Sequence, residues 1–207
     1  MVKNPPANVG GSDTFFMDTA TQIEKTMKEQ IVEAIPEIDL ITDADLREKT
    51  VQVWEDAITE GGWTLEAIGK MPFSVHVENC NITFIEHVRT VCKMCIAVAD
   101  ILQESYGTRS NINYDYLIAG ALLADVGKLI EYEEKDGKIM QAGRGQHLRH
   151  PFTGVAMSHF RGIPAEVQHI IATHSKEGEM MERSNESVIF HHADFIDFDL
   201  VSKTRPF

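Results

Sequence analysis

The sequence predicts an all-α fold, and two observations support that prediction. Apolar residues recur every three or four positions along nearly the whole chain, as on the buried face of a helix, and no convincing run alternates as a half-buried strand would. The chain has 207 residues, of which 43% are hydrophobic and 25% charged. A chain of this size and composition buries a sizeable core, so it needs neither disulfides nor metal merely to fold.

In the first half of the chain, capping residues and glycines mark two helices. The first is expected over residues 14–34, because Pro36 cannot continue it. The second is expected to begin at the cap Thr42–Asp43 and to end at Gly61–Gly62. Together they form a helical segment, residues 14–80, that we expect to pack on the core.

The second half, residues 81–207, reads as a helical domain. Residues 83–102 form a strong amphipathic helix, and residues 114–130 are apolar on nearly all sides, which predicts a central, buried helix. A long glycine-containing loop with a short hairpin follows. Further helices are expected to begin at Pro151 and Pro164, and the last over residues 186–200.

Composition limits the compartment and the partners. Nineteen basic and 32 acidic side chains give a net charge of −13, which disfavours nucleic acid as a partner. Residues 1–13 carry paired prolines and glycines without an apolar run, so we expect a disordered lead-in rather than a signal peptide. No stretch approaches a membrane span. Three cysteines fit a reducing compartment, so we expect a cytoplasmic protein.

Asp125 breaks the hydrophobic pattern of the most buried helix. An unpaired carboxylate there is costly, so a cation, a metal or a hydrogen-bond network must neutralise it. Lys128, three residues later, is one partner, and a metal ion is the other.

Polar side chains on other helices also face inward. Each taken singly reads as a satisfied core residue or a cap, but several on different helices of one small domain predict a metal site. They are His87, His150, His174 and Asp194.

The order of these residues resembles the HD-domain superfamily of metal-dependent phosphohydrolases. The segment from Leu122 to Lys128 is similar to that family's LLHDIGK signature with one change, and His191 to Asp197 is similar to its H-x-A-D-x-x-D ending. The resemblance covers residues 83–200. It implies an HD-domain-like helical bundle that binds one or two divalent ions, with manganese, iron, cobalt, nickel, zinc and magnesium not distinguishable.

The resemblance also implies two sets of ligands that share one carboxylate. His87, Asp125 and Asp194 match the ligands of a first ion. Asp125 would bridge to a second ion held by His150 and His174.

Ala124 stands where the family has its name-giving histidine. The change removes one ligand, which leaves a weaker first site or one completed by His147, His191 or water. It also keeps open a degenerate domain that binds or regulates without turnover.

The resemblance implies hydrolysis of a phosphoester, with Asp125 and Lys128 as catalytic residues. A basic island of Arg144, His147 and Arg149 precedes His150 and suits a small anionic substrate, such as a phosphorylated metabolite or nucleotide, although a solvated loop explains it equally well. An HD-type di-iron oxygenase is the alternative enzyme. A homo-oligomer also stays open.

Overall fold

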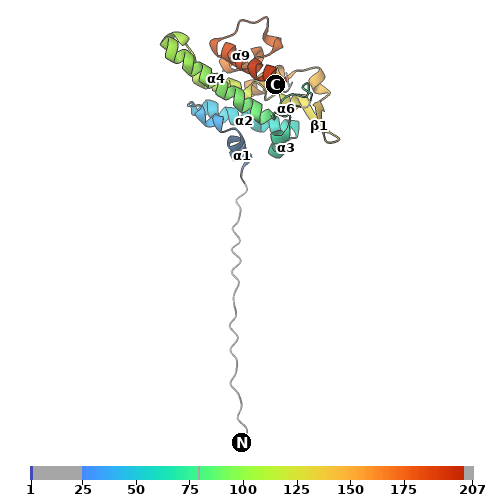
Figure 1. Ribbon diagram of the computed structural model, residues 1–207. Helices are drawn as coiled ribbons and strands as arrows, with labels where there is room; N and C mark the ends of the chain where they lie inside the picture. Colours follow the sequence, from blue (N-terminus) through green and yellow to red (C-terminus); the bar gives the residue numbers. More distant parts are fainter. Residues whose placement is uncertain (2–24, 79, 203–207) are drawn as a thin grey trace.

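The computed structural model describes residue 1 and residues 25–78 and 80–202, and it confirms the helical fold (Figure 1). The expected lead-in falls almost wholly outside the described residues. The helices and strands follow one another along the chain as α1 (Met27–Ala34), α2 (Ala44–Gly61), α3 (Leu65–Lys70), α4 (Phe84–Tyr106), α5 (Tyr114–Leu123), α6 (Lys128–Glu131), β1 (Tyr132–Lys135), β2 (Lys138–Gln141), α7 (His150–Phe160), α8 (Ala165–Thr173) and α9 (Asn185–Ser202), with short 3₁₀ helices at Pro36–Leu40, Gly107–Ser110, Arg144–Gln146 and Lys176–Gly178.

The helix caps explain where the predicted helices begin and end. Asp43 accepts hydrogen bonds from the first turn of α2, and Gly62 ends that helix at a φ of 70°, as predicted. Thr83 caps α4 in a reciprocal box with Glu86. The helix that ends at Ala34 begins at Met27 rather than at residue 14, because Thr26 caps it in a similar box; residues 14–24 lie outside the described residues.

The expected single helix over residues 114–130 is wrong, because the chain breaks into α5 and α6 with a turn between them. The start of α7 packs against this turn so closely that a Cβ on Gly127 would lie 2.2 Å from the carbonyl oxygen of His150. Because of this break, Asp125 lies in a turn rather than within a helix, while its apolar neighbours remain in the core.

The N-terminal helices are tied to this broken helix by two indoles. Trp54 of α2 donates a hydrogen bond to the carbonyl of Leu122 at 3.2 Å, and Trp63 donates to the carbonyl of Leu129 at 2.7 Å. Both rings are buried, as is Phe73, so all three aromatic side chains belong to the core.

Helix α4 runs across the middle of the molecule in Figure 1, with α9 on one side of it in this view and α1 and α2 on the other. Its inner face packs against α5 and α9, and α5 in turn contacts α8. Every residue of α5 from Leu117 onward is buried. This arrangement brings the ends of several helices to the turn that follows α5.

A short antiparallel hairpin follows α6, as the sequence predicted. Tyr132 pairs with Gln141 and Lys135 with Lys138, and Asp136 and Gly137 turn the chain at positive φ. Proline marks the next two helices: Pro151 is the second residue of α7, and Pro164 caps α8. Within the described residues, no helix is long and apolar enough to cross a membrane.

Candidate metal centre

The five side chains predicted as metal ligands meet around Asp125, in the turn between α5 and α6. His87 comes from α4, His150 begins α7, His174 follows the last turn of α8, and Asp194 lies on α9. Two groups that share Asp125 could each hold an ion: one is completed by His150 and His174, the other by His87 and Asp194. Within each group the ligand atoms lie within 4.8 Å of one another.

The first group faces one oxygen of the Asp125 carboxylate. Oδ1 lies 3.3 Å from Nε2 of His150 and 3.7 Å from Nε2 of His174. The two Nε2 atoms are 3.2 Å apart. Two nitrogens bound to one tetrahedral ion at ~2.1 Å would be separated by about 3.4 Å, so the spacing suits a shared ion.

The other ring nitrogens of these two histidines fix their tautomers. Nδ1 of His174 donates to the carbonyl oxygen of Ile171 at 2.7 Å, and a carbonyl can only accept. Nδ1 of His150 lies 2.7 Å from the Glu131 carboxylate, which also accepts the His150 backbone N–H. In neutral rings both Nε2 atoms therefore present lone pairs to each other and to a carboxylate, and a cation between them relieves that repulsion. The donor set fits a divalent metal.

The second group faces the other oxygen. Oδ2 of Asp125 lies 3.0 Å from Nε2 of His87 and 2.8 Å from Nζ of Lys128. The same Nε2 of His87 is 3.2 Å from Asp194, and its Nδ1 is 2.7 Å from Asp197. Lys128 thus pairs with Asp125, as its sequence spacing allowed.

An aromatic side chain closes this half of the centre. The ring of Phe73 stacks on His87 with centroids 4.6 Å apart, and the carbonyl of Phe73 accepts a hydrogen bond from Lys128 at 3.1 Å. Phe198 of α9 meets the Phe73 ring edge-on. The segment before α4 therefore contributes a wall that the sequence did not reveal.

Burial and charge shift the pKa values of the three histidines in different directions: those of His87 and His174 rise and that of His150 falls. Burial alone would lower the pKa of His87, but hydrogen bonds with the three surrounding carboxylates, Asp125 foremost, raise it to about 10. Burial lowers the pKa of His150, against the effect of Glu131. Burial opposes ionisation of Asp125 too, but the Lys128 charge and the histidines hold the pKa of that carboxyl well below its usual range.

Ala124 is fully buried at the end of α5. Neither side chain suggested as a replacement for the absent histidine belongs to the two ligand groups. His147 is exposed, and Nδ1 of His191 instead donates to the carbonyl of His174 at 2.7 Å. The half of the centre next to His87 therefore has no added nitrogen donor among the described residues.

In the structure, the two arginines of the basic island contact different carboxylates. Arg144 points to Glu60 of α2, 2.6 Å away. Arg149 lies 3.1 Å from Glu131, the carboxylate that also holds His150, and its side chain remains 44% exposed. Among the three predicted substrate-binding residues, Arg149 thus has a contact that links it to the metal centre.

The sequence reasoning overlooked the carboxylates behind the histidines. Glu131 supports His150, and Asp197, the last residue of the H-x-A-D-x-x-D ending, supports His87. Their signals were present: both are acidic residues within one helical turn of a candidate ligand or of Lys128. Their roles required the three-dimensional fold.

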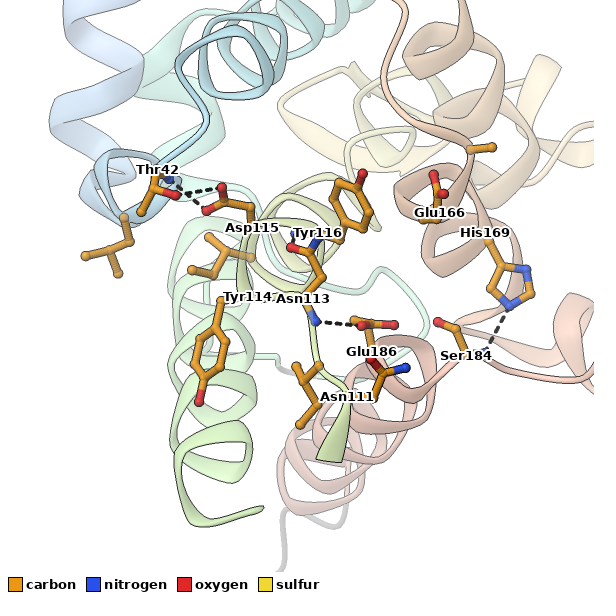
Figure 2. A pocket seen from close by; sticks show the side chains of 14 residues that line it. Thr42, Asn111, Asn113, Tyr114, Asp115, Tyr116, Glu166, His169, Ser184 and Glu186 are labelled. Atoms are coloured by element: carbon orange, nitrogen blue, oxygen red, sulfur yellow. Dashed lines mark hydrogen bonds between the residues drawn. The ribbon is translucent and has the colours of Figure 1, made fainter. Parts of the chain in front are cut away.

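A large pocket lies elsewhere, around the start of α5 (Figure 2). It is lined by side chains such as Thr42, Tyr116 and His169, and includes none of the predicted ligands. Asp115 accepts two hydrogen bonds from Thr42 there, and Glu186 accepts one from the backbone of Asn113.

Comparison with known proteins identifies the class. The model of the HD domain family matches residues 84–199, and the chain belongs to this family. The resemblance noted in the sequence is thereby confirmed.

One curated relative is a dihydroneopterin 2′,3′-cyclic phosphate phosphodiesterase from Methanocaldococcus jannaschii. It is 32% identical over 165 residues, which cover 76% of this chain and 64% of the relative. The chain therefore spans just under two thirds of that protein's length. No solved structure matched the chain.

Proposed function

We propose that this protein is a metal-dependent phosphohydrolase that cleaves a phosphoester of a small metabolite, with a cyclic phosphodiester as the preferred class. The observation that carries the proposal is the convergence of the His150 and His174 Nε2 atoms on Oδ1 of Asp125. Membership of the HD domain family and the activity of the curated relative support the reaction type.

The residues that would hold an ion are the two groups around Asp125. Such an ion supplies Lewis acidity, which lowers the pKa of water and draws negative charge from a phosphoryl oxygen. Glu131 and the carbonyl of Ile171 keep the two imidazoles of the first group in the ligating tautomer. These contacts hold both rings with Nε2 turned towards Asp125.

Arg149 is the cation best placed to meet the substrate. Its side chain is 44% exposed, its guanidinium group lies 3.1 Å from Glu131, and the planar fork of that group matches phosphate oxygens. Lys128 is 8% exposed and already pairs with Asp125. Its positive charge would therefore act on the phosphate indirectly, through its interaction with Asp125. The net charge of −13 favours a small anion over a nucleic acid strand.

The test is a metal-reconstituted assay on matched esters. The protein is stripped with a chelator, loaded with Mn²⁺, Fe²⁺ or Zn²⁺, and offered nucleoside 2′,3′-cyclic phosphates, the corresponding linear monophosphates and bis-p-nitrophenyl phosphate. We expect turnover that depends on metal, is fastest on the cyclic diesters and is lost in Asp125→Asn. Metal binding without turnover of any ester would instead identify a domain that has lost catalysis.

A further inference from the structure

His174 lies at the end of α8, directly after the last helical residue, Thr173. A helix leaves the carbonyl groups of its last turn without partners inside the helix, so other groups must bind them. Nδ1 of His174 itself donates to the carbonyl oxygen of Ile171 at 2.7 Å, which fixes the ring relative to this turn. The direction of Nε2 therefore depends on how the backbone on both sides of His174 is held.

The peptide plane before His174 is held by Arg183, from the segment between α8 and α9. Nε of Arg183 donates to the carbonyl oxygen of Thr173 at 2.9 Å. Gly178 packs against the same group so closely that a Cβ there would lie 2.4 Å from that oxygen. The Thr173 hydroxyl lies 2.6 Å from the hydroxyl of Ser187, at the start of α9. The end of α8 is thus fastened to the chain that follows it.

The peptide plane after His174 is held by His191, on α9, whose Nδ1 donates to the carbonyl oxygen of His174 at 2.7 Å. His174 keeps helical backbone angles there, with φ at −69° and ψ at −35°. Because peptide planes are rigid, fixing the two planes beside a residue fixes its φ and ψ. Nε2 of His174 lies 3.2 Å from Nε2 of His150 and 3.7 Å from Oδ1 of Asp125. A rotation of either plane would move Nε2 relative to both partners.

Arg183 occupies its position at a cost. Its Nη2 atom is buried and has no hydrogen-bond partner among the described residues. A buried, unpaired N–H of a charged group is unfavourable. Among the contacts of the described residues, the bond from Nε to Thr173 is the one that favours an arginine at this position.

We infer that Arg183 and His191 are positioning residues for the candidate metal ligand His174. They hold the two peptide planes beside it and so direct its Nε2 towards Asp125. Neither residue belongs to the candidate ligand groups. The inference rests on the proposed metal-dependent function and names further residues that this function requires.

Paired substitutions separate each hydrogen bond from the rest of its side chain. Arg183→Gln keeps an N–H donor near the position of Nε and removes the unpaired Nη2, whereas Arg183→Met has a similar length and no donor. His191→Asn likewise keeps a donor near the position of Nδ1, and His191→Leu does not. Lys176→Met, at an exposed position of the same segment, is the control for the loss of a positive charge.

Isothermal titration calorimetry with Mn²⁺ measures the Kd for the metal. We expect the Kd to rise about tenfold or more in Arg183→Met and His191→Leu, and to stay within about threefold of wild type in the two donor-retaining variants and the control. Urea unfolding in chelator reports stability separately. An unchanged Kd with lowered stability in the donor-free variants would show a purely structural role and overturn the inference. Equal losses of affinity in Arg183→Gln and Arg183→Met would also overturn it.

Where a donor-free variant does not fold, the donor-retaining variants decide. Wild-type affinity in Arg183→Gln and His191→Asn supports the inference, and a tenfold loss of affinity in them overturns it.

A second readout needs no metal. In chelator, the ring of His174 is followed by ¹⁵N NMR of selectively labelled histidine, with its signal identified by its absence in His174→Gln. We expect the Nδ1 signal to move or broaden in Arg183→Met and to stay as in wild type in Arg183→Gln. A wild type that binds no metal, or hydrolyses no ester, would remove the proposed function, while this signal still tests the positioning of His174. An unchanged signal in Arg183→Met would overturn the role of Arg183.

Discussion

The carboxylate of Glu131 holds His150 at two points, its backbone nitrogen and its Nδ1 atom, each 2.7 Å away. The side chain of Glu131 is fully buried, on α6, one turn beyond the Asp125 turn. One carboxylate thus fixes the start of α7 and the orientation of a candidate ligand together. Burial raises the pKa of Glu131, but the hydrogen bonds and charge of His150 together with the charge of Arg149 bring it below its usual value.

Glu131→Gln should weaken metal binding by about 10- to 100-fold, because an amide orients the imidazole and raises its basicity less than a carboxylate does. Isothermal titration calorimetry with Mn²⁺ or Zn²⁺ measures this directly. Glu133→Gln, on the exposed side of the hairpin, is the matched control and should bind as the wild type does. Equal affinity in both variants would contradict a role for Glu131 in orienting His150.

Asp125→Asn should lose bound metal and activity together. The asparagine amide has almost the same shape as the carboxylate, but it is uncharged and its oxygen is a weaker metal ligand. Both candidate ligand groups of the centre include this position. Metal content and hydrolysis of the phosphate esters are measured on the same preparation. Asp39→Asn, an exposed site, controls for the loss of one acidic residue. Retention of full metal content in a folded Asp125→Asn protein would show that Asp125 is a structural acid.

Gly127→Ala should destabilise the protein by about 3 kcal/mol or more, because its Cβ would overlap the carbonyl of His150 at 2.2 Å and backbone atoms cannot move aside cheaply. Gly143→Ala is the matched control, since a Cβ there meets nothing within 4 Å. Urea unfolding of both variants measures the difference. A Gly127→Ala protein as stable as the control would show that α7 can shift away from the Asp125 turn.

The metal-free protein should lose stability as the pH rises from about 6.5 towards 10. The pKa of His87 is raised to about 10, so the folded state keeps a proton that the unfolded state releases near pH 6.5. The contribution is complete below the unfolded value and is lost as the pH rises through the folded one, with a slope of at most about 1.4 kcal/mol per pH unit.

Urea unfolding in chelator at pH 6.5, 7.5 and 8.5 measures this slope. His174 contributes in the same direction and His150 in the opposite one, so the informative quantity is the difference between wild type and His87→Gln. That difference should shrink as the pH rises. A difference that stays constant would mean that His87 is neutral in the folded state.

Local signals in the sequence located most helix ends. The caps at Asp43 and Thr83 and the stop at Gly62 depend only on neighbouring residues, so they could be predicted. The break after Leu123 could not, because the apolar pattern continues through it. The break is dictated by the close approach of α7 to Gly127, a contact between segments more than twenty residues apart.

The pattern that predicted the candidate ligands could not predict the residues that hold them in place. Asp125, His87 and His174 interrupt apolar helices, and buried polar residues demand a partner. Phe73 looks like any core aromatic in the sequence, and its stacking on His87 depends on the bridge between Pro72 and Thr83 just before α4. The placement of Arg144 on Glu60 likewise arises from tertiary packing.

The hydrogen bonds donated by the indoles of Trp54 and Trp63 limit where the chain can be truncated. The HD family match begins at residue 84, but Leu122 and Leu129 place their carbonyl oxygens against rings that precede it. A fragment that started at residue 84 would leave these acceptors unpaired and expose the apolar floor of the turn that carries Asp125. The smallest piece that folds cooperatively is therefore expected to include α2 and the segment that follows it, and residue 84, where the family match begins, is a poor boundary for expression.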